Sequence, residues 1–559
     1  METHIDENQF LKPASSPNAV KSKKIVDIRL ACIEDGLDNT GFRKIAAYIK
    51  SINPSTKVAY VPTANHRNLI GVLMEKGGGN LGRSDIYKVA QFMAEGDIAA
   101  FSSMTQSAKT VYEIIAQLRN INPLTYIIWG GIHPIIQPED AIKHADAVCT
   151  GEGEFAFETF LELFKNNKDF KNTPGFWFRE GEKINKNRNL PLMTPKQMDE
   201  LPPLAYEDGE VVYRKGKGFG KISSSDYLDY AGLQYGTVWS IGCPLHCTYC
   251  GNTKFIEYDN AYRRIRHSSP ETIINEIKRA ISKQPHLSTV AFHDDSFLSL
   301  PYKQLEEFSK LYKAEIKIPF VIYGVIPTYV REDKIALLLD AGMNRVRMGI
   351  QSGSENILEF YKRPTKLHRI KEATEILNKF KKYMIPPSYD IILENPIETP
   401  EDTRATLDML YEMPRPYTLN IYALRIIPNT TMEEDIKKRG LKTPPIDKNY
   451  FIDYHRTLGN CLVFALTFWK MPKWLYKKLR NKVYPVHTEQ PLYPTLFALI
   501  RTVYYIKRAF DHLLFMDFSV LPGKPGYYMW KIGIIKFWRR LILKRYILTE
   551  KEKTTNSTV

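Results

Sequence analysis

Three cysteines stand within one decapeptide, Gly242–Gly251, with the spacing C-x3-C-x2-C. They are Cys243, Cys247 and Cys250, and Tyr249 precedes the third. Thiolates are the usual ligands of iron–sulfur clusters, so this short loop can bind three irons of a [4Fe–4S] cluster. The fourth iron would then stay open to a substrate or cofactor, as open positions do at catalytic metals. The loop therefore predicts a catalytic cluster.

A zinc site is the alternative for this loop, with His246 or a distant residue as a further ligand. Structural zinc sites usually have four ligands, commonly in two separated pairs, and no fourth Cys follows nearby. The remaining cysteines, Cys32, Cys149 and Cys461, are scattered, which is typical of buried free thiols and not of a disulfide framework. A reducing cytoplasmic location is therefore expected.

Length and charge set further limits. A chain of 559 residues with 43% hydrophobic content suits a globular protein of about two to four domains. Residues 1–24 are polar and lack a signal-peptide core, so we expect a disordered tail. Residues 451–559 hold 19 Lys and Arg against 6 Asp and Glu, a surplus of +13 in a chain of +16. The uncharged run 457–469 is shorter than the roughly 20 residues that span a bilayer, so no transmembrane helix is predicted.

Strand and helix signals alternate over residues 25–170, which predicts a parallel, doubly wound, Rossmann-like (flavodoxin-like) sheet. The expected strands cover 25–30, 58–61, 98–102 and 126–129. Ligands of such sheets bind at the carboxyl ends of the strands. Polar and glycine residues collect at those ends: Ser102, Thr105, Gly130, Gly131, His133, Gly151 and Glu152.

A second alternating region covers 236–440, after a Gly-, Lys- and Pro-rich stretch over 171–235 that is typical of a linker. Its expected strands cover 236–240, 289–293, 320–323, 345–349, 389–393 and 419–424. Six strand–helix units are too few for a closed eight-stranded barrel. Residues 441–559 are expected to be mostly helical, basic and aromatic.

The cysteine loop resembles the signature of the radical S-adenosylmethionine (SAM) superfamily. The resemblance implies a partial (β/α)6 TIM-like barrel with a lateral opening for substrate. It also implies that the open iron binds the amino and carboxylate groups of SAM, and that the reduced cluster cleaves SAM to a 5′-deoxyadenosyl radical. Tyr249 would contact the adenine through its backbone.

Two further segments support that resemblance. Gly349–Glu355 resembles the family's G-I-Q-S-G segment, which implies that Gln351 or Ser352 bonds the ribose or carboxylate of SAM, while Ser354 could simply cap the next helix. Asp294 and Asp295 follow an expected strand and would lie near the SAM amine or ribose, where a carboxylate suits an ammonium group. Helix capping by Asp295 or Ser296 is the alternative. The sequence leaves open whether Arg345 or Arg347 points into the barrel. Glu398 is expected to be structural.

The first domain is similar to the cobalamin-binding domain that precedes the barrel in one radical SAM class. Its glycines would let the backbone approach a flat corrin ring without a Cβ in the way. The D-x-H-x-x-G segment that supplies a cobalt ligand is absent, because Asp35, Gly36 and Gly41 stand there without a histidine. Cobalamin would then bind without a protein imidazole, unless His133, which could equally cap a turn, is the ligand. A domain that binds nothing is the alternative.

These resemblances imply a cobalamin-dependent methyltransferase acting on an unactivated carbon. A second SAM would methylate the cobalamin, and an electron donor such as flavodoxin or ferredoxin would reduce the cluster. A lipid, terpenoid or other secondary metabolite suits the basic aromatic tail as substrate. The alternatives are a non-methylating cyclase or C–C bond-forming enzyme and a membrane-surface Fe–S sensor without turnover.

The C-terminal region has its own alternatives. Segments 496–516 and 530–540 interleave aromatic residues with Lys and Arg, which is typical of helices on a membrane surface. A helical cap with a solvated basic face is the plainer interpretation. No nucleic acid is expected, because no RNA-binding module is evident.

Overall fold

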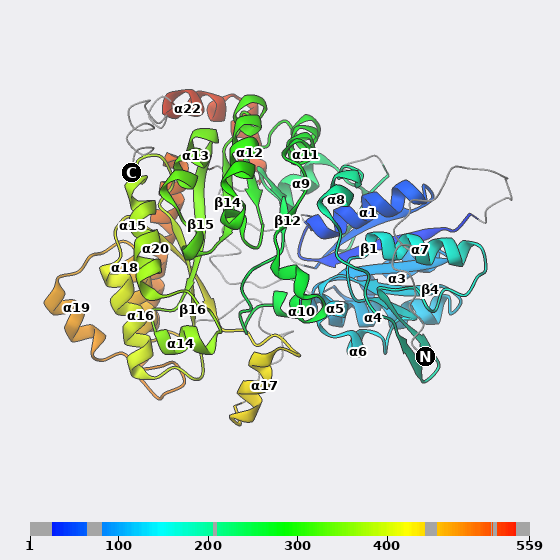
Figure 1. The fold of residues 1–559 in the computed structure, drawn as a ribbon, viewed down its shortest axis with the longest axis horizontal. Helices are drawn as coiled ribbons and strands as arrows, with labels where there is room; N and C mark the ends of the chain where they lie inside the picture. The colour runs from blue at the N-terminus through cyan, green and yellow to red at the C-terminus, as the bar shows by residue number, and fades with distance from the viewer. Residues whose placement is uncertain are drawn as a thin grey trace.

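The computed structural model describes residues 25–37, 39–63, 81–204, 209–441, 455–515, 517 and 523–543. The tail expected over 1–24 lies outside them. Two α/β units lie side by side, and the C-terminal helices over 458–514 cover the second unit on the side away from the first (Figure 1). The helix over 523–531 packs instead against the helix over 224–230.

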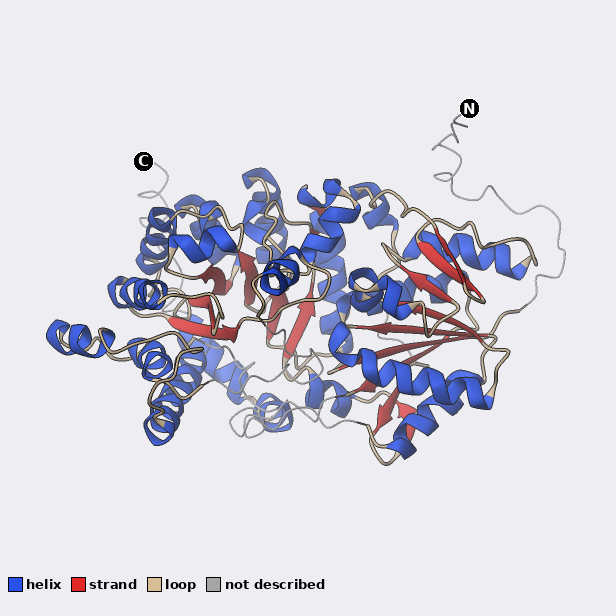
Figure 2. Cartoon of the chain, turned by 90° about the horizontal axis from the view of Figure 1, so that it is seen from below, coloured by secondary structure: helices blue, strands red, loops and turns tan. Residues whose placement is uncertain are grey.

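The first unit is built on one sheet with the strand order β7-β6-β5-β4-β3-β1-β2-β8-β9. The strands from β5 to β8 in that order run parallel to one another. At the two ends of this parallel set, β6 pairs antiparallel with β5 and β9 pairs antiparallel with β8. The central strands are β1 (Ile28–Glu34), β2 (Lys57–Pro62), β3 (Ile98–Ser103), β4 (Tyr126–Gly130) and β5 (Ala147–Cys149). Nearly all their residues are buried, since helices lie on both faces of the strands (Figure 2). The predicted doubly wound fold is confirmed.

The helices of this unit follow the strands in the expected alternation. They are α1 (Thr40–Ile52), α3 (Arg83–Ala94), α4 (Ala108–Ile121), α5 (Ile132–Ile136), α6 (Pro138–Ala141) and α7 (Glu154–Lys165), with a 3-10 turn, η2 (Thr105–Ser107). The helix α1 begins where the Asn39 side chain accepts from the Phe42 N–H (2.6 Å).

Residues 171–235 are not a simple linker. They contain β6 (Phe176–Glu180), β7 (Lys183–Lys186), α8 (Pro195–Glu200), β8 (Val211–Arg214), β9 (Gly218–Lys221) and α9 (Ser224–Tyr230). The four strands extend the first sheet at both edges. Edge strands are short and often carry charged residues, and their tight turns use glycine, as at Gly181 (φ +62°) and Gly216 (φ +75°). That composition is also typical of linkers, which explains the error.

The second unit is an open sheet of six parallel strands in the order β10-β13-β14-β15-β16-β17. The strands are β10 (Gln234–Thr237), β13 (Thr289–Phe292), β14 (Phe320–Val325), β15 (Met343–Gln351), β16 (Ser388–Leu393) and β17 (Thr418–Ala423). The intervening helices are α11 (Pro270–Lys283), α12 (Tyr302–Glu315), α13 (Glu332–Ala341), α14 (Glu355–Phe360), α15 (Leu367–Lys379) and α16 (Pro400–Glu412), and α17 (Thr431–Lys438) follows β17. The predicted partial barrel is confirmed.

The first strand of this sheet ends earlier than expected. A strand was predicted over 236–240, but β10 ends at Thr237 and the chain then forms β11 (Ser240–Ile241). This short strand pairs with β12 (Arg266–His267) and so encloses the cysteine loop and α10 (Asn252–Tyr258) between two antiparallel strands.

The two faces of β15 settle the orientation of its arginines. Val346, Met348 and Ile350 pack in the core against the outer helices, so by alternation Arg345 and Arg347 both point to the inner face. Arg345 donates to the Tyr323 hydroxyl (2.8 Å) and pairs with Asp517 (2.6 Å).

The C-terminal helices close the open edge of the second sheet. They are α18 (Leu458–Leu466), α19 (Lys473–Arg480), α20 (Pro494–Leu514), α21 (Gly523–Lys531) and α22 (Ile534–Leu543). The edge strand β17 is covered by α20: Tyr504 and Arg508 both donate to the Leu419 carbonyl, and Arg508 also donates to Asn420 Oδ1 (2.8 Å). Covering an edge in this way removes unpaired backbone groups from solvent. Among the described residues, no helix is long and apolar enough to cross a membrane.

The contacts of Arg508 predict a measurable contribution to stability. Arg508→Ala removes both bonds to β17, so we expect the free energy of unfolding to fall by about 1–3 kcal/mol. Its neighbour Lys507 pairs only with Asp511 along the helix, so Lys507→Ala should cost less than about 0.5 kcal/mol. Urea titration of both variants measures the difference, and equal losses would contradict the role assigned to Arg508.

Candidate active site

A glycine allows the cysteine loop to turn sharply at its start. Gly242 has φ +121°, and a Cβ there would lie 2.6 Å from the Arg264 carbonyl oxygen and 2.8 Å from that of Tyr262. The next residue, Cys243, donates its N–H to the same Tyr262 carbonyl (3.1 Å). Any side chain at position 242 would therefore push the loop away from the segment that follows α10.

The two aspartates at the end of β13 hold this loop in place. Asp294 is 2% exposed and accepts from the Trp239 N–H (3.0 Å), the Ser240 N–H (2.7 Å) and the Ser240 hydroxyl (2.5 Å). Burial raises the pKa of its carboxyl to about 6. Asp295 accepts from the Tyr262 hydroxyl (2.9 Å), the Asn252 side chain and the Gly242 backbone, and burial raises the pKa of its carboxyl. We call this pair the aspartate clasp.

The clasp changes the role expected of Asp294. Its oxygens already accept three hydrogen bonds, and it does not line the central cavity described below. Asp295 does line that cavity. A carboxylate has about four lone-pair positions, so Asp295 retains capacity for a ligand.

A buried cation beside the cysteines has no signal in the sequence. Arg363 is 7% exposed, and its Nη1 lies 3.7 Å from Cys247 Sγ and 3.2 Å from the Tyr249 hydroxyl. Its Nη2 donates to the Gly349 carbonyl (2.5 Å), which ties the cysteine loop to β15. A guanidinium at this place favours negative charge on thiolate sulfur. The residue follows α14 in a short turn, and no spacing connects it with the cysteines.

The donor set of the loop suits a cluster better than a single ion. Cys243, Cys247 and Cys250 are all free, and burial raises the thiol pKa of Cys243 to about 11 and that of Cys250 to about 12. Binding iron would therefore release protons. In the part of the chain that the structure describes, no group of three His, Cys, Asp or Glu side chains is arranged to hold one metal ion. A [4Fe–4S] cluster needs no such group, because each thiolate binds a different iron.

The segment after β15 divides between the site and the core. Gln351 has a left-handed backbone (φ +76°), a conformation that costs a non-glycine residue about 1–3 kcal/mol and often marks functional sites. Its side-chain amide lies against Gly349. Ser352, by contrast, is fully buried with its hydroxyl 3.2 Å from that of Thr406 on α16, so it is placed for packing and not for SAM. Ser354 caps α14 by accepting from the Ile357 N–H (3.4 Å).

A cavity of about 490 Å³ lies between the two units. Residues from both carboxyl edges line it. From the first unit come Ser102, Gly130, Gly131, Gly151, Glu152 and Gly153, and from the second come Ser240, Asn252, Tyr262, His293 and Asp295. We call this space the central cavity. It joins the predicted corrinoid edge to the residues that hold the cysteine loop.

The glycine at the end of β4 is needed for this edge. Gly131 has φ +90°, and a Cβ there would lie 2.8 Å from the Ser103 backbone and 2.9 Å from the Ser102 hydroxyl. Glycine at position 131 is therefore required by the close approach of this turn to β3, and Gly130 and Gly131 together border the central cavity without side chains.

Two of the residues predicted for this edge face elsewhere. His133 is 1% exposed, 3.0 Å from the Tyr112 hydroxyl and 3.7 Å from Asp140, and burial lowers the pKa of its imidazole to about 4. Neither His133 nor Thr105 is among the residues that line the central cavity. The reason is that α5 turns the His133 ring back against Trp129 (centroids 4.8 Å apart). In the described residues of the first unit, no histidine lines the cavity.

Three polar contacts fix the two units around the central cavity. Glu152 pairs with Arg266 on β12 (2.8 Å) and accepts from the Met193 N–H (2.7 Å). Lys44 on α1 donates to the Val238 carbonyl (3.2 Å), and Tyr258 on α10 donates to the Ile135 carbonyl (2.8 Å). Glu152 therefore joins the units, and it also lines the central cavity.

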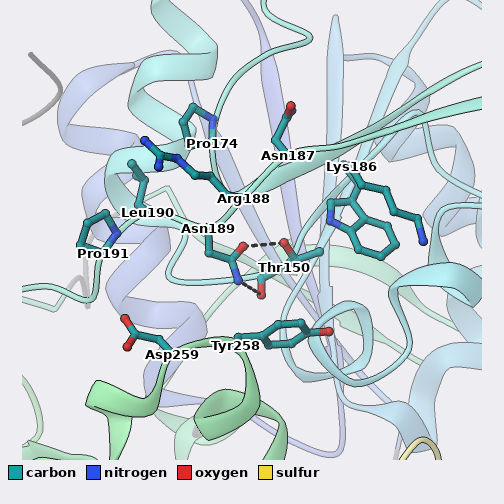
Figure 3. Close-up of a pocket in the computed structure, with 11 residues that line it drawn as sticks. Thr150, Pro174, Lys186, Asn187, Arg188, Asn189, Leu190, Pro191, Tyr258 and Asp259 are labelled. Atoms are coloured by element: carbon teal, nitrogen blue, oxygen red, sulfur yellow. Dashed lines mark hydrogen bonds between the residues drawn. The ribbon is translucent and has the colours of Figure 1, made fainter. Parts of the chain in front are cut away.

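A second cavity, of about 560 Å³, adjoins the first (Figure 3). The two share the wall that contains Thr150, Asn189 and Tyr258. Asn189 holds this wall by accepting from the Thr150 hydroxyl (2.7 Å) and donating to the Thr150 carbonyl (3.2 Å). The lining includes Lys186 and Arg188 from the first unit and Asp259 from the second, and the loop cysteines are among the lining residues of neither cavity.

Comparison with protein families agrees with this arrangement. The B12 binding domain matches residues 83–161, and the radical SAM superfamily matches residues 237–410. The first match covers the strand ends with Ser102, Gly130 and Gly151, and the second contains the cysteine loop and Gln351.

Curated relatives are distant. The chain is 25% identical over 330 residues to an uncharacterized methyltransferase of Pyrococcus horikoshii, covering 58% of this chain and 66% of the relative. It is 23% identical to bacteriochlorophyllide d C-8(2)-methyltransferase of Chlorobaculum tepidum (62% and 70% covered). It is 25% identical to anaerobic magnesium-protoporphyrin IX monomethyl ester cyclase of Synechocystis sp. (50% and 52% covered). Across these relatives, the chain matches from about half to about two thirds of their length.

Solved structures share the fold. The radical SAM methyltransferase TsrM from Kitasatospora setae, with cobalamin and a [4Fe–4S] cluster bound, superposes with a TM-score of 0.58 at 16% identity, covering 75% of this chain and 76% of that one. The cobalamin-dependent radical enzyme OxsB, with aqua-cobalamin and SAM bound, gives 0.57 at 15% identity, covering 95% and 78%. At these identities the likeness is one of fold.

The cysteine loop predicts which thiols are needed for iron. Cys243→Ala, Cys247→Ala and Cys250→Ala should each lose SAM cleavage, because each removes a ligand of one iron. Cys461→Ala is the matched control, since Cys461 is buried among the C-terminal helices and should leave iron content unchanged. After anaerobic purification, iron analysis measures the cluster content and 5′-deoxyadenosine formation measures SAM cleavage. Full activity in any of the three loop variants would refute the cluster.

Arg363 predicts a shift in reduction potential. Arg363→Gln removes a positive charge next to Cys247, and a reduced cluster carries more negative charge, so the potential should fall by roughly 60 mV or more. Arg363→Lys should shift it less because the charge is kept. An EPR-monitored redox titration measures the potential. If Arg363→Gln keeps its full iron content and its reduction potential is unchanged, Arg363 contributes packing and not an electrostatic effect on the cluster.

Proposed function

We propose that this radical SAM protein, whose B12-binding domain precedes its radical SAM domain, transfers a methyl group from SAM to an unactivated carbon. One observation carries the proposal. The glycine edge of the B12-binding domain lines the central cavity together with Ser240, Asn252 and Asp295, the residues of the radical SAM domain that flank or hold the cysteine loop. A methyl donor on one side and a radical source on the other could therefore act on one substrate.

The chain's own residues hold and orient the reactants. When bound, the cluster supplies the electron that cleaves SAM, and the corrinoid carries the methyl group. The three loop cysteines would bind the cluster, and Asp295, with its remaining lone-pair position, would accept from the SAM ammonium group. Gln351, beside Gly349, would bond the ribose or carboxylate. Gly130 and Gly131 would let the corrin ring approach the sheet edge, without an imidazole from the first unit.

The relatives support this reaction and also one alternative. The Pyrococcus and Chlorobaculum relatives are named methyltransferases. The Synechocystis relative is named a cyclase at the same identity as the Pyrococcus protein, and this observation favours a non-methylating cyclisation as the second candidate. A lipid or terpenoid is the substrate class that we propose. A flavodoxin or ferredoxin in a reducing cytoplasm would supply electrons.

The two candidates differ in what turnover releases. Methylation through a corrinoid uses one SAM as methyl donor and one as radical source, so we expect S-adenosylhomocysteine and 5′-deoxyadenosine in about equal amounts. The reconstituted holoprotein is incubated anaerobically with a lipid extract and SAM that carries a trideuterated methyl group. Mass spectrometry then identifies any labelled product.

Controls separate the outcomes. Cys250→Ala should release neither product above background. A protein that retains no corrinoid after anaerobic reconstitution would contradict the methyltransferase proposal. Unlabelled 5′-deoxyadenosine formed without S-adenosylhomocysteine and without a labelled product would instead favour the cyclase.

A further inference from the structure

The outer face of α20 carries an exposed apolar stripe. Its members recur every three or four residues and so share one face of the helix. They are Leu496, Leu499, Val503, Ile506, Phe510 and Leu514, each between 36% and 66% exposed. The opposite face is buried, since Phe497 and Tyr504 pack against α18. The stripe is therefore not part of the core of the described chain.

The apolar surface continues beyond the end of α20. Trp538 on α22 donates its indole N–H to the Leu513 carbonyl (3.0 Å), which places α22 against the last turn of α20. Phe537 is 65% exposed. Lys531 at the end of α21 and Lys536 on α22 are exposed as well.

We propose that the α20 stripe docks on the surface of an anionic lipid bilayer, with α20 lying in the plane of the interface. The helix is about 31 Å long at 1.5 Å per residue, yet its interruption by Arg501, Lys507, Arg508 and Asp511 suits an interfacial helix and not a spanning one. This inference goes beyond the proposed reaction and does not depend on it.

Charge complementarity selects the lipid surface as the occupant. The described residues after 454 contain 15 Lys and Arg against 3 Asp and Glu. Anionic lipid attracts such a segment. A second copy of the chain would bring the same positive charge to the contact, and like charges facing each other weaken an interface.

Docking would also give the open edge of the second sheet a fixed position. The inner face of α20 holds β17 through Tyr504 and Arg508. The same helix would therefore contact the bilayer on one side and the barrel edge on the other.

The test compares a stripe variant with a matched control. Leu499→Gln, Ile506→Gln and Phe510→Gln together remove apolar surface without changing charge. Their effect is measured by co-sedimentation of the holoprotein with phosphatidylcholine vesicles, with and without phosphatidylglycerol. We expect at least about tenfold weaker binding to the anionic vesicles. The control combines Tyr87→Gln, Leu124→Gln and Ile184→Gln, which are exposed apolar residues of the first unit, and should bind like the wild type.

A charge variant and a fold check complete the experiment. Lys531→Gln with Lys536→Gln should weaken binding about fivefold per charge on anionic vesicles only, and added salt should do the same. If the triple variant loses iron or has a lower melting temperature than the wild type, Ile506→Gln alone, at the most exposed stripe position, replaces it in the binding measurement. Equal wild-type binding to both vesicle types, no binding, or unchanged binding of the stripe variant would overturn the proposal. So would a lipid-free dimer that the stripe variant converts to a monomer, because a second copy would then cover the stripe.

Discussion

The aspartate clasp at the end of β13 is the constraint on which the candidate site depends. Asp294 fixes the chain just before the cysteine loop, and Asp295 fixes its first residue, Gly242, together with the helix that follows. The backbone N–H groups of Cys243 and Thr248 donate to the carbonyls of Tyr262 and Tyr361, but the start of the loop must also be anchored to the sheet. Two adjacent carboxylates at a strand end do this, and the buried Asp294 has an elevated carboxyl pKa as a result of that placement. The loop is therefore held by the sheet before any cofactor binds.

The second requirement is that two sheets present their ligand edges to one space. Each edge alone is an ordinary feature of a parallel α/β sheet. The Glu152–Arg266 pair and the contacts of Lys44 and Tyr258 cross the junction and bring the edges together. Because these bonds surround the central cavity, the distance between a corrinoid and SAM would be set by polar contacts outside the reacting atoms. Such positioning is how a protein contributes when the cofactors supply the chemistry.

The C-terminal helices solve a problem that an incomplete barrel creates. A sheet of six strands leaves β17 as an edge with free backbone groups, and α20 covers this edge and satisfies one of those groups, the Leu419 carbonyl, through Tyr504 and Arg508. The inner face of the same helix combines these polar contacts with the packing of Phe497 and Tyr504, while its outer face carries the apolar stripe. Arg345, Arg347 and Asp390 make the inner surface of the sheet polar as well.

The sequence by itself determined the two α/β units and their cofactor classes, and it predicts the cluster ligands. Those features depend on local patterns: strand–helix alternation, glycines at strand ends and cysteine spacing within a single loop. The tertiary structure decided the rest. His133 and Ser352 lie in the segments that were predicted to bind cofactors, but their side chains point away from the site. The His133 ring on α5 lies against Tyr112, and the Ser352 hydroxyl lies against Thr406 on α16. Arg363 reaches Cys247 across 116 positions of the chain. The edge strands of 171–235 are ordered by a sheet that their own sequence does not reveal. Segment composition predicts the strands and helices inside each unit, but the edge strands, the direction of a side chain and its distant partners are set by packing, which depends on the whole chain at once.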